Sequence, residues 1–504
     1  MPPRKLLVFL VSAVLVNAAQ QSQLENVNHT AVAQCCSEIS QQWPDLVDSS
    51  NSNQHYYAMQ QVDIHPQCRF TPLSPSDVSA VVGILNENGC AFAVKSGGHG
   101  VWAGHSNIEG GVVVDFTKMR SIEVDSEQRI ARLEPGATWE EVYQIMDAHN
   151  ITVSGGRIAT VGVGGYLLGG GISFLSYERG FACDSIVNYQ IVLSNGIIVE
   201  ANATSNSDLY WALKLGSTNY GIVTRFDVVT YDASSQIYAG AQAYGLSDDV
   251  QEPLLEKWLS YIANLTIDPK VAGLINLNGS AELEALIRVY LDPEDADFSS
   301  YVPDTPVVDT MGFTNTADFI ESIENVCGVD KRVSWYTITV SAELSLMEDL
   351  LNRTQQEHFS LSSQFPGVEF YTTLQPISKG FTAGSQGNPV HSVLAERDED
   401  LVLVVWYALW DDPAYDVAVD DAVVAFGNSV EEDIRQQGLL NNFLYLNYAN
   451  KRQAVYDRSV SKDSLSKMIE AKQKYDPENV FGRLWHGGYK LPQAPENTDH
   501  RREL

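Results

Sequence analysis

The sequence predicts an α+β protein of two domains, on three observations. The chain has 504 residues, which is more than one hydrophobic core usually organises. Hydrophobic residues make up 44% of it and charged residues 19%, as is typical of a globular protein. Helical and strand patterns alternate up to about residue 230, and longer strand-like runs with fewer glycine-rich loops follow.

The first clear element is a helix that ends at Asn88-Gly89. Apolar residues recur at helical spacing before this dipeptide, and we expect them to face the core. We expect Ser76 and Asp77 to cap the start of the helix, because short polar side chains accept hydrogen bonds from the first-turn amides. The residues of the apolar face are Val78, Val81, Val82 and Leu85.

Short strands and a second helix follow. Residues 91–94 and 112–114 are brief apolar runs of the kind that form buried strands. Thr138 and Glu141 have the spacing of a capping box, so a helix should begin there. Together these patterns predict alternating strands and helices in the first part of the chain.

A hairpin closes this first part. Residues 189–193 and 197–199 flank Asn195-Gly196, and Asn-Gly is a strong hairpin turn signal. Beyond about residue 237 we expect an antiparallel sheet with helices on one face, including a strand at 401–409. Residues 463–475 near the end form an amphipathic helical pattern.

The N-terminus has the pattern of a secretory signal peptide over residues 1–18. Arg4 and Lys5 precede a short apolar run at 6–16, and small residues follow. No later stretch has about 18 consecutive apolar residues, so we expect no membrane span. Export is also suggested by glycosylation sequons, which begin at Asn28, Asn150, Asn202, Asn264, Asn278 and Asn352.

Charge and cysteines exclude some partners. The net charge of -32 argues against nucleic acid or an anionic membrane as partner, because both would repel the chain. No two of the six cysteines form a C-x-x-C pair, so we expect no structural zinc. In an oxidising compartment a disulfide or two is the expected use.

Three glycine-dense stretches carry the chemical signal, at residues 95–100, 155–171 and 216–224. Glycines allow backbone amides to approach a phosphate without side chains in the way, so three such stretches suggest a diphosphate-bearing cofactor. The G-x-G-x-x-G pattern does not occur in its strand-to-helix setting, which argues against a Rossmann fold. P-loop, zincin and nucleophile-elbow motifs do not occur either.

These stretches belong to an ordered set of motifs that resembles the berberine-bridge-enzyme-like FAD-linked oxidases. This family, of which the chain looks like a secreted, fungal-type member, lies in the vanillyl-alcohol oxidase superfamily with a PCMH-type FAD-binding domain. The resemblance covers roughly residues 65–230 and 440–482. The motifs are Ser-Gly-Gly-His at 96–99, Glu-Pro-Gly-Ala-x-Trp at 134–139, Thr-Val-Gly-x-Gly-Gly at 160–165, Gly-Ile-Val-Thr at 221–224, Tyr-x-Asn-Tyr at 445–448 and Lys-Tyr-Asp-Pro at 474–477.

The resemblance implies a division of the chain. A PCMH-type FAD-binding domain of two α+β subdomains would precede a substrate domain with an antiparallel sheet and helices, and the end of the chain would return to the first domain. The expected boundaries are 1–18 for the signal peptide, 19–64 for an N-terminal extension, 65–236 for the FAD-binding domain, 237–440 for the substrate-binding domain, 441–490 for the C-terminal return and 491–504 for a polar tail.

The resemblance also implies FAD bound covalently through His99. The family's second link comes from a cysteine, but Ile158 occupies that position here, so we expect a single link. Val161 matches a position where valine goes with oxygen access to the flavin. The further cofactor-binding residues expected from the motifs are Lys95, Ser96, Gly97, Gly98, Gly100, Ser106, Pro135, Gly136, Thr160, Val161, Gly162, Gly164, Gly165, Gly221, Ile222, Val223 and Asn447.

The family also suggests a disulfide between Cys90 and an N-terminal cysteine, given first as Cys36 with Cys35 as the alternative. For Cys183 and Cys327 we expect buried free thiols. No partner is assigned to Cys68.

The candidates for catalysis follow from the same resemblance. Tyr445 and Tyr448 are expected to reach the substrate as base or orienting residue, and a tyrosine base needs a neighbouring cation or the flavin to lower its pKa. Gln375 and Tyr371 are expected to contact the substrate. Some relatives carry a base near Val405, which itself has no proton chemistry.

The function expected from this set is a secreted FAD-dependent oxidase. It would abstract a hydride from a C–H beside oxygen or nitrogen in a small natural product, with O₂ as electron acceptor. One alternative is a carbohydrate oxidase that forms a lactone, although the missing second link weakens it. Another is a flavin-binding secreted protein without turnover. The sequence leaves the substrate open, because the loops of the second domain decide it.

Overall fold

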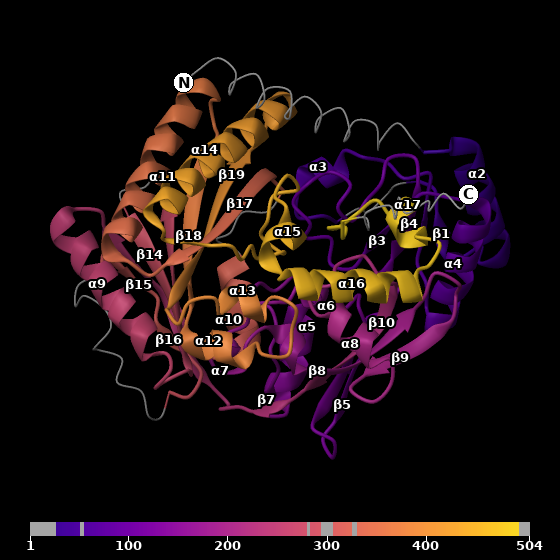
Figure 1. The fold of residues 1–504 in the computed structure, drawn as a ribbon, viewed down its shortest axis with the longest axis horizontal. Helices are drawn as coiled ribbons and strands as arrows, with labels where there is room; N and C mark the ends of the chain where they lie inside the picture. Colours follow the sequence, from indigo (N-terminus) through magenta and orange to yellow (C-terminus); the bar gives the residue numbers. More distant parts are fainter. Residues whose placement is uncertain (1–26, 51–54, 280–282, 294–305, 325–329, 493–504) are drawn as a thin grey trace, which may run out of the picture.

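The computed structural model describes residues 27–50, 55–279, 283–293, 306–324 and 330–492. The predicted signal peptide, Cys327 and the polar tail from residue 493 lie outside this range. Figure 1 shows two regions side by side: strands and helices from the first half of the chain, and a large sheet covered by long helices from the second half. The fold is of the mixed α+β class that the sequence predicts.

The first region contains two sheets. In the four-stranded sheet, of order β1-β2-β4-β3, strands β2, β4 and β3 are parallel and β1 is antiparallel to β2. The five-stranded sheet, of order β5-β6-β10-β8-β9, is antiparallel throughout. The strands are β1 Val47–Asp48, β2 Cys68–Phe70, β3 Phe92–Lys95, β4 Val112–Asp115, β5 Ile122–Asp125, β6 Ile130–Leu133, β8 Ile186–Val192, β9 Ile198–Asn202 and β10 Ile222–Val229. A small pair joins β7 Ile151–Thr152 to β11 Tyr231–Asp232.

Helices pack between and around these sheets. The α-helices are α2 His29–Gln42, α3 Met59–Val62, α4 Pro75–Asn88, α5 Trp139–Ala148, α6 Val163–Leu168, α7 Ser176–Arg179 and α8 Ser207–Leu213, and two 3₁₀ turns lie at η1 Phe116–Lys118 and η2 Ala182–Ser185. The capping box of α5 is confirmed: the Thr138 amide donates to Glu141 Oε2 at 3.0 Å. The hairpin is confirmed as β8–β9, and its turn residue Gly196 has φ +79.

The cap of α4 differs from the prediction. Its apolar face is buried as expected, but the capping residue is Ser74, whose Oγ accepts from the Asp77 amide at 3.2 Å. Pro75 is the first helical residue, a position that suits its fixed φ and missing amide hydrogen. Ser76 and Asp77 therefore lie inside the first turn.

The second region is built on one nine-stranded antiparallel sheet of order β15-β12-β14-β13-β18-β19-β17-β20, with β16 paired to β12. Its strands are β12 Ile237–Gly245, β13 Val271–Asn278, β14 Leu283–Tyr290, β15 Val308–Asp309, β16 Gly312–Thr314, β17 Arg332–Ser341, β18 Glu369–Ile377, β19 Leu401–Trp410 and β20 Leu440–Asn441. The expected antiparallel sheet and the expected strand at 401–409 are both confirmed.

Long helices cover the outer face of this sheet (Figure 1), where Trp406 is fully buried. They are α9 Asp248–Asn264, α11 Leu344–Gln364 and α14 Asp416–Gln437. The other helices of this half are α10 Thr316–Glu324, α12 Lys379–Gly384, α13 His391–Leu394 and the 3₁₀ turn η3 Pro413–Tyr415. The inner face of the sheet is turned toward the first region.

The end of the chain packs on the first region. Its helices are α15 Val455–Ser459, α16 Lys462–Tyr475 and α17 Val480–Arg483. The amide of Phe92 in β3 donates to the Leu484 carbonyl at 2.8 Å, and the two aromatic rings of Phe92 and Trp485 stack. The predicted amphipathic helix is α16, capped by Ser461.

Two disulfides fasten the N-terminal helix. Cys35 of α2 bonds to Cys90, and Cys36 bonds to Cys68 of β2. The first-named pairing of Cys36 with Cys90 is therefore wrong, and the alternative with Cys35 holds. Adjacent residues of a helix point about 100° apart, so two neighbouring cysteines reach different partners. Cys183 is a buried free thiol as expected.

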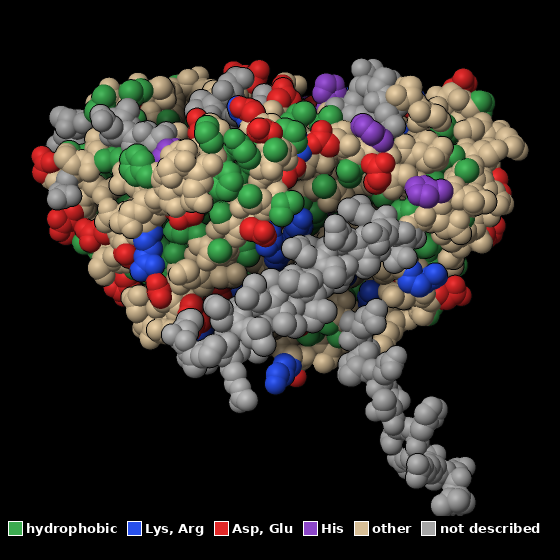
Figure 2. All heavy atoms as spheres, turned by 90° about the horizontal axis from the view of Figure 1, so that it is seen from above, with side chains coloured by type: hydrophobic (Ala, Val, Ile, Leu, Met, Phe, Trp, Pro, Cys, Tyr) green, Lys and Arg blue, Asp and Glu red, His purple; other side chains and the backbone are tan. Residues whose placement is uncertain are grey.

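The surface agrees with the acidic composition. Acidic side chains are scattered over the face shown in Figure 2. Within the described ranges, no helix is long and apolar enough to cross a membrane. The same residues contain no cluster of three or more His, Cys, Asp or Glu that could hold a metal ion.

Candidate active site

A cavity of about 360 Å³ lies between the glycine loops of the first region and the inner face of the large sheet. Small-molecule sites commonly measure roughly 300 to 1000 Å³. Both regions and the segment 445–448 contribute walls, so residues far apart in the sequence meet here. The cavity brings together most of the residues that the sequence analysis predicted.

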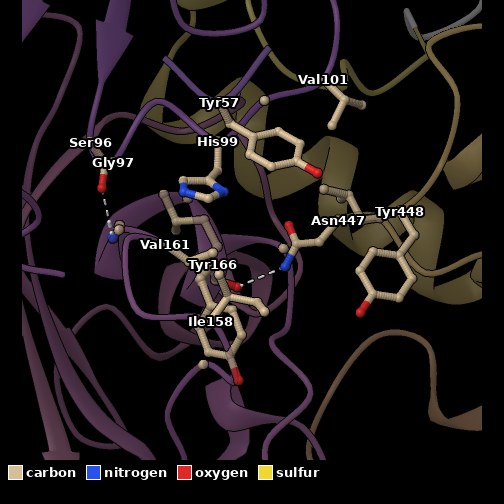
Figure 3. A pocket seen from close by; sticks show the side chains of 18 of the residues that line it. Tyr57, Ser96, Gly97, His99, Val101, Ile158, Val161, Tyr166, Asn447 and Tyr448 are labelled. Atoms are coloured by element: carbon tan, nitrogen blue, oxygen red, sulfur yellow. Dashed lines mark hydrogen bonds between the residues drawn. The ribbon is translucent and has the colours of Figure 1, made fainter. Parts of the chain in front are cut away.

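One end of the cavity is formed by two glycine loops in close contact. A Cβ on Gly97 would lie 2.3 Å from the Gly162 nitrogen, so neither loop could carry a side chain at this crossing. Gly98 has φ +76, which glycine adopts without strain. Ser96 Oγ donates to the Pro135 carbonyl at 2.5 Å and accepts from the Gly164 amide at 3.2 Å (Figure 3). These contacts hold a backbone-lined wall without bulky side chains.

His99 lies in the middle of this wall (Figure 3). Its ring stacks on Tyr57 with 4.9 Å between ring centroids, and Nε2 lies 2.7 Å from Thr160 Oγ1. Thr160 in turn donates its hydroxyl hydrogen to Glu324 Oε1, and its amide donates to Glu324 Oε2 at 2.9 Å. A hydroxyl has one hydrogen, so Thr160 accepts from His99 and the imidazole carries its proton on Nε2. The lone pair is then on Nδ1.

The histidine is also held in its neutral form. Burial and the nearby Lys95 charge lower the pKa of His99 to about 4. Neutral imidazole is the nucleophilic form, so His99 is ready for bond formation at neutral pH. The position of the family's second flavin link offers no nucleophile, because Ile158 lines the cavity there. The free thiol of Cys183 is buried outside the cavity, and burial raises the pKa of Cys183 well above the ordinary thiol value.

The opposite wall is the inner face of the large sheet. Trp335 of β17 pairs in register with Tyr407 of β19, and Thr373 of β18 pairs with Val405. Alternate residues of a strand point to one face, so these side chains enter the cavity together. Asn276 of β13 donates to Thr373 Oγ1 at 2.8 Å and to the Tyr407 oxygen at 3.0 Å. The wall is therefore aromatic with a few ordered polar groups.

Arg157 connects the two walls. Its Nη2 donates to Gln375 Oε1 at 2.5 Å and to the Tyr448 oxygen at 3.1 Å. Gln375 Nε2 donates to the same tyrosine oxygen at 3.2 Å. The guanidinium thus orients two of the residues predicted to meet the substrate.

Tyr445 and Asn447 support this arrangement from the C-terminal segment. Asn447 Nδ2 donates to the Tyr166 carbonyl and to the Tyr445 oxygen, both at 3.1 Å. Burial raises the pKa of Tyr445 above the ordinary tyrosine value, so its hydroxyl stays protonated. Of the two tyrosines, Tyr448 is the one that contacts the cation.

Most predicted residues line the cavity. Those on the cofactor side are Ser96, Gly97, Gly98, His99, Gly100, Ser106, Pro135, Val161, Gly162, Gly164, Gly165, Ile222, Val223 and Asn447, and those on the substrate side are Gln375, Tyr445 and Tyr448. Val405 also lines it. Tyr371 does not: it stacks on Tyr407, and its hydroxyl lies 2.7 Å from Glu369 Oε2.

Four predicted cofactor residues do not line the cavity. Lys95 is buried with Nζ 3.5 Å from Asp115 Oδ1, and Thr160 reaches the cavity only through His99. A Cβ on Gly136 would lie 1.8 Å from the Phe116 carbonyl oxygen, and one on Gly221 would lie 2.5 Å from that of Val192. These contacts hold the loops that form the wall, and the cofactor-binding role of the four residues stays a prediction.

Several site residues were missed from the sequence. Arg157 had a signal, because it is the only charged residue in the glycine stretch 155–171. Trp335 and Tyr407 lie on strands, and the face of the sheet on which their side chains lie could not be assigned without the strand register. His105 lines the cavity, and its Nδ1 is buried without a hydrogen-bond partner among the described residues. Glu324 and Thr160 are 164 residues apart in the sequence and come into contact only in the folded chain.

Comparison with known proteins decides the family. Residues 66–202 match the family model described as an FAD binding domain. FAD-dependent monooxygenase tpcD of Cochliobolus heterostrophus is 30% identical over 475 residues, which covers 89% of both chains. FAD-dependent monooxygenase drtC of Aspergillus calidoustus is 29% identical over 521 residues and covers 96% of both. The chain belongs to the berberine-bridge-enzyme-like family of FAD-linked oxidoreductases.

Solved structures share this family's fold. 6-Hydroxy-D-nicotine oxidase from Arthrobacter nicotinovorans superposes with a TM-score of 0.73 at 20% identity, covering 88% of this chain and 97% of that one. Glucooligosaccharide oxidase from Acremonium strictum, which carries 6-S-cysteinyl, 8α-N1-histidyl FAD, gives 0.73 at 19% identity, covering 91% and 100%. The fold is the PCMH-type FAD-binding fold with a substrate domain.

FAD is the cofactor of this oxidoreductase. The residues present fit it: the side-chain-free crossing of Gly97 and Gly162 leaves backbone at the cavity wall, and His105 Nδ1 offers an unused polar atom there. Glycine backbone suits a diphosphate, which needs amide donors at short range.

Proposed function

We propose that this flavoenzyme is an oxidase that removes a hydride from a C–H beside oxygen or nitrogen in a small natural product, with O₂ as the final acceptor. The observation that carries the proposal is the juxtaposition of His99 and the glycine loops with an ordered aromatic wall across one cavity. A substrate between them would face the flavin on one side and Trp335, Tyr407 and Gln375 on the other. FAD, when bound, supplies the hydride acceptor.

His99 would hold the cofactor covalently. Its Nδ1 has the free lone pair and would form the link to FAD, and Thr160 and Glu324 would accept the proton that Nε2 gives up. The two electrons released go to O₂, which leaves as hydrogen peroxide. Ile158 has no nucleophile, so the link would be single.

Tyr448 would orient the substrate. Its oxygen accepts hydrogen bonds from Arg157 and Gln375, so its own hydroxyl hydrogen remains to donate to a bound molecule. Among the described residues, the cavity lining contains no Asp or Glu that could act as base. The free hydroxyl hydrogen supports positioning of the substrate as the role of the tyrosine.

The protein would work outside the cell. The signal-peptide pattern and the two disulfides support export, because disulfides persist in oxidising compartments. Small-molecule substrate and O₂ are the partners expected there.

The test is an anaerobic substrate panel read at the flavin absorbance band. Alcohols, amines, phenols, aromatic acids and oligosaccharides are added in turn, and O₂ is admitted afterwards. We expect bleaching by one small aromatic or heterocyclic class, then reoxidation with one hydrogen peroxide formed per flavin.

Other outcomes would replace the proposal. Bleaching by oligosaccharides alone would favour a lactone-forming carbohydrate oxidase. Oxygen found in the product instead of hydrogen peroxide would favour a monooxygenase, the activity after which the curated relatives are named. No bleaching by any class would favour a flavin-binding protein without turnover.

A further inference from the structure

The charge of the cavity points to the class of the substrate. Resting on the proposed oxidase function, we propose that the substrate carries an ionised oxygen on an aromatic ring system, as a carboxylate or an acidic phenol, and that Arg157 binds this oxyanion. The inference starts from a cation that has no counterion.

Among the residues that the structure describes, Arg157 is the only Lys or Arg that lines the cavity, and no Asp or Glu lines it. Its two hydrogen bonds go to neutral oxygens, on Gln375 and Tyr448. Among the described residues it forms no ion pair with a carboxylate, in a protein whose acidic residues outnumber the basic ones by 64 to 32. The positive charge therefore stands uncompensated in the wall.

Two other enclosed arginines are paired with carboxylates, whereas buried Arg288 contacts only neutral oxygens, those of Gln242 and Tyr290, among the described residues. Arg69 lies 2.8 Å from Asp115, and Arg332 lies 2.6 Å from Asp416 Oδ2. A guanidinium is always charged, and removing it from water without an anion is unfavourable. An anionic group on a bound molecule would remove this penalty, and Arg157, unlike Arg288, lines a cavity large enough to hold such a molecule.

The unused hydrogen-bond donors of Arg157 and Tyr448 suit a negatively charged oxygen on a ligand. Nη2 of Arg157 is used, whereas Nε and Nη1 bond to none of the described residues. The Tyr448 oxygen already accepts twice, so it can only donate further. Arginine nitrogens and a hydroxyl donor suit an oxyanion, and the planar fork favours two-point contact with a carboxylate.

The surroundings favour an aromatic carrier for this oxygen. Trp335 lies edge-on to Tyr448 at 5.2 Å between ring centroids and at 6.3 Å from Tyr407. Aromatic side chains prefer to contact a further ring edge-to-face or offset. In Figure 3 Tyr448 lies on the far side of His99 from Ser96 and Gly97, so this subsite is separate from the glycine-loop end.

The absence of a carboxylate base from the lining agrees with this class. A phenol that enters already ionised needs no residue to remove the proton of that hydroxyl group before hydride transfer, whereas a carboxylate would serve only as the group that Arg157 binds. Arg157 then both selects the ionised form and fixes the ring relative to the flavin.

The test measures ligand binding to the flavin-loaded protein at pH 8, by perturbation of flavin absorbance and by equilibrium dialysis. Benzoate and 4-nitrophenolate are the two oxyanion probes, and benzamide is the neutral match for benzoate. The variants are Arg157→Gln and Arg157→Lys. Arg129→Gln, which removes an exposed arginine outside the cavity, is the control.

We expect one or both oxyanions to bind the wild type and benzamide to bind at least about tenfold more weakly. Arg157→Gln should weaken oxyanion binding by roughly 10- to 100-fold, the effect of losing a charged hydrogen bond. Arg157→Lys should lose less, and Arg129→Gln nothing. Whichever of benzoate and 4-nitrophenolate binds more tightly indicates whether the substrate oxyanion is a carboxylate or a phenolate.

Equal binding of benzoate and benzamide by the wild type would overturn the inference, even if Arg157→Gln failed to fold. Unchanged oxyanion affinity in a flavin-loaded Arg157→Gln protein would also overturn it. These failures differ from failure of the oxidase function, in which oxyanions would bind with Arg157 dependence but no compound would reduce the flavin.

Discussion

Thr160 joins two parts of the chain that are 164 residues apart, because its hydroxyl links His99 to Glu324 at the end of α10. This contact sets which imidazole nitrogen carries the proton, and so which one is free to bond. It also gives the Nε2 proton a path to a carboxylate. We therefore propose that one carboxylate from the second region sets the protonation of a histidine in the first.

Glu324→Gln should therefore slow covalent attachment of FAD. Glutamine can still accept from Thr160 but cannot take the proton, so we expect attachment to slow by roughly 100-fold, within the usual range for a general base. The measurement follows protein-bound flavin fluorescence in denaturing gels after FAD is added to apoprotein. Glu321→Gln, on the exposed side of the same helix, is the matched control. Equal rates for the two variants would remove Glu324 from the account.

Val161 should control the reaction of the reduced flavin with O₂. It lines the cavity beside His99 (Figure 3), and a larger side chain would fill the approach to the ring. Val161→Leu should slow reoxidation by about tenfold or more, or about 1.4 kcal/mol in the barrier. Stopped-flow mixing of the photoreduced enzyme with O₂ gives the rate. If wild type and variant reoxidise equally slowly, a dehydrogenase is favoured instead.

At the scale of elements, local patterns were predictable and long-range ones were not. The α5 capping box and the β8–β9 hairpin depend on residues a few positions apart, and both were predicted. The α4 cap was displaced to Ser74 because Pro75 begins the helix. The glycine loops were recognisable from composition. By contrast, the facing of Trp335 and Tyr407 depends on strand register, which only the assembled sheet defines.

The same limit applies to the site. His99, Gln375 and Tyr448 were predicted from family motifs, and the structure brings them to one cavity. The Arg157 contacts to Gln375 and Tyr448 span 218 and 291 residues, and no local pattern encodes them. Tyr371 does not line the cavity itself but stacks on Tyr407, which does, so its predicted contact with the substrate stays a prediction.

The disulfides of α2 yield a prediction about stability. Cys36–Cys68 closes a loop with a sequence separation of 32. By the chain-entropy model, Cys36→Ser should lower the free energy of unfolding by roughly 3 to 4 kcal/mol. Denaturant unfolding monitored by tryptophan fluorescence measures this loss. Cys183→Ser is the control, because that cysteine is in no disulfide. A change below about 1 kcal/mol for Cys36→Ser would show that this bond adds little to the packing of the helix and the Cys35–Cys90 disulfide.

At the scale of the whole molecule, the acidic surface and the disulfides suit an exported protein. We expect the secreted form to begin after residue 18 and to carry glycans at Asn28, Asn150 and Asn352, whose side chains are exposed. Asn202 should stay unmodified, because its Nδ2 donates to Asn188 Oδ1 at 3.0 Å. Glycopeptide mass spectrometry of protein recovered from the medium tests both points. An intact Met1 with no glycan mass would contradict export.

The central claim is that this cavity holds FAD joined to the chain at His99 alone. The most direct measurement is peptide mapping by mass spectrometry of the purified, denatured protein. The account predicts one flavin-bearing peptide, modified at His99, and a yellow acid precipitate that becomes colourless in His99→Ala. Free FAD released from the denatured wild type, or a flavin peptide modified at Cys183, would contradict it.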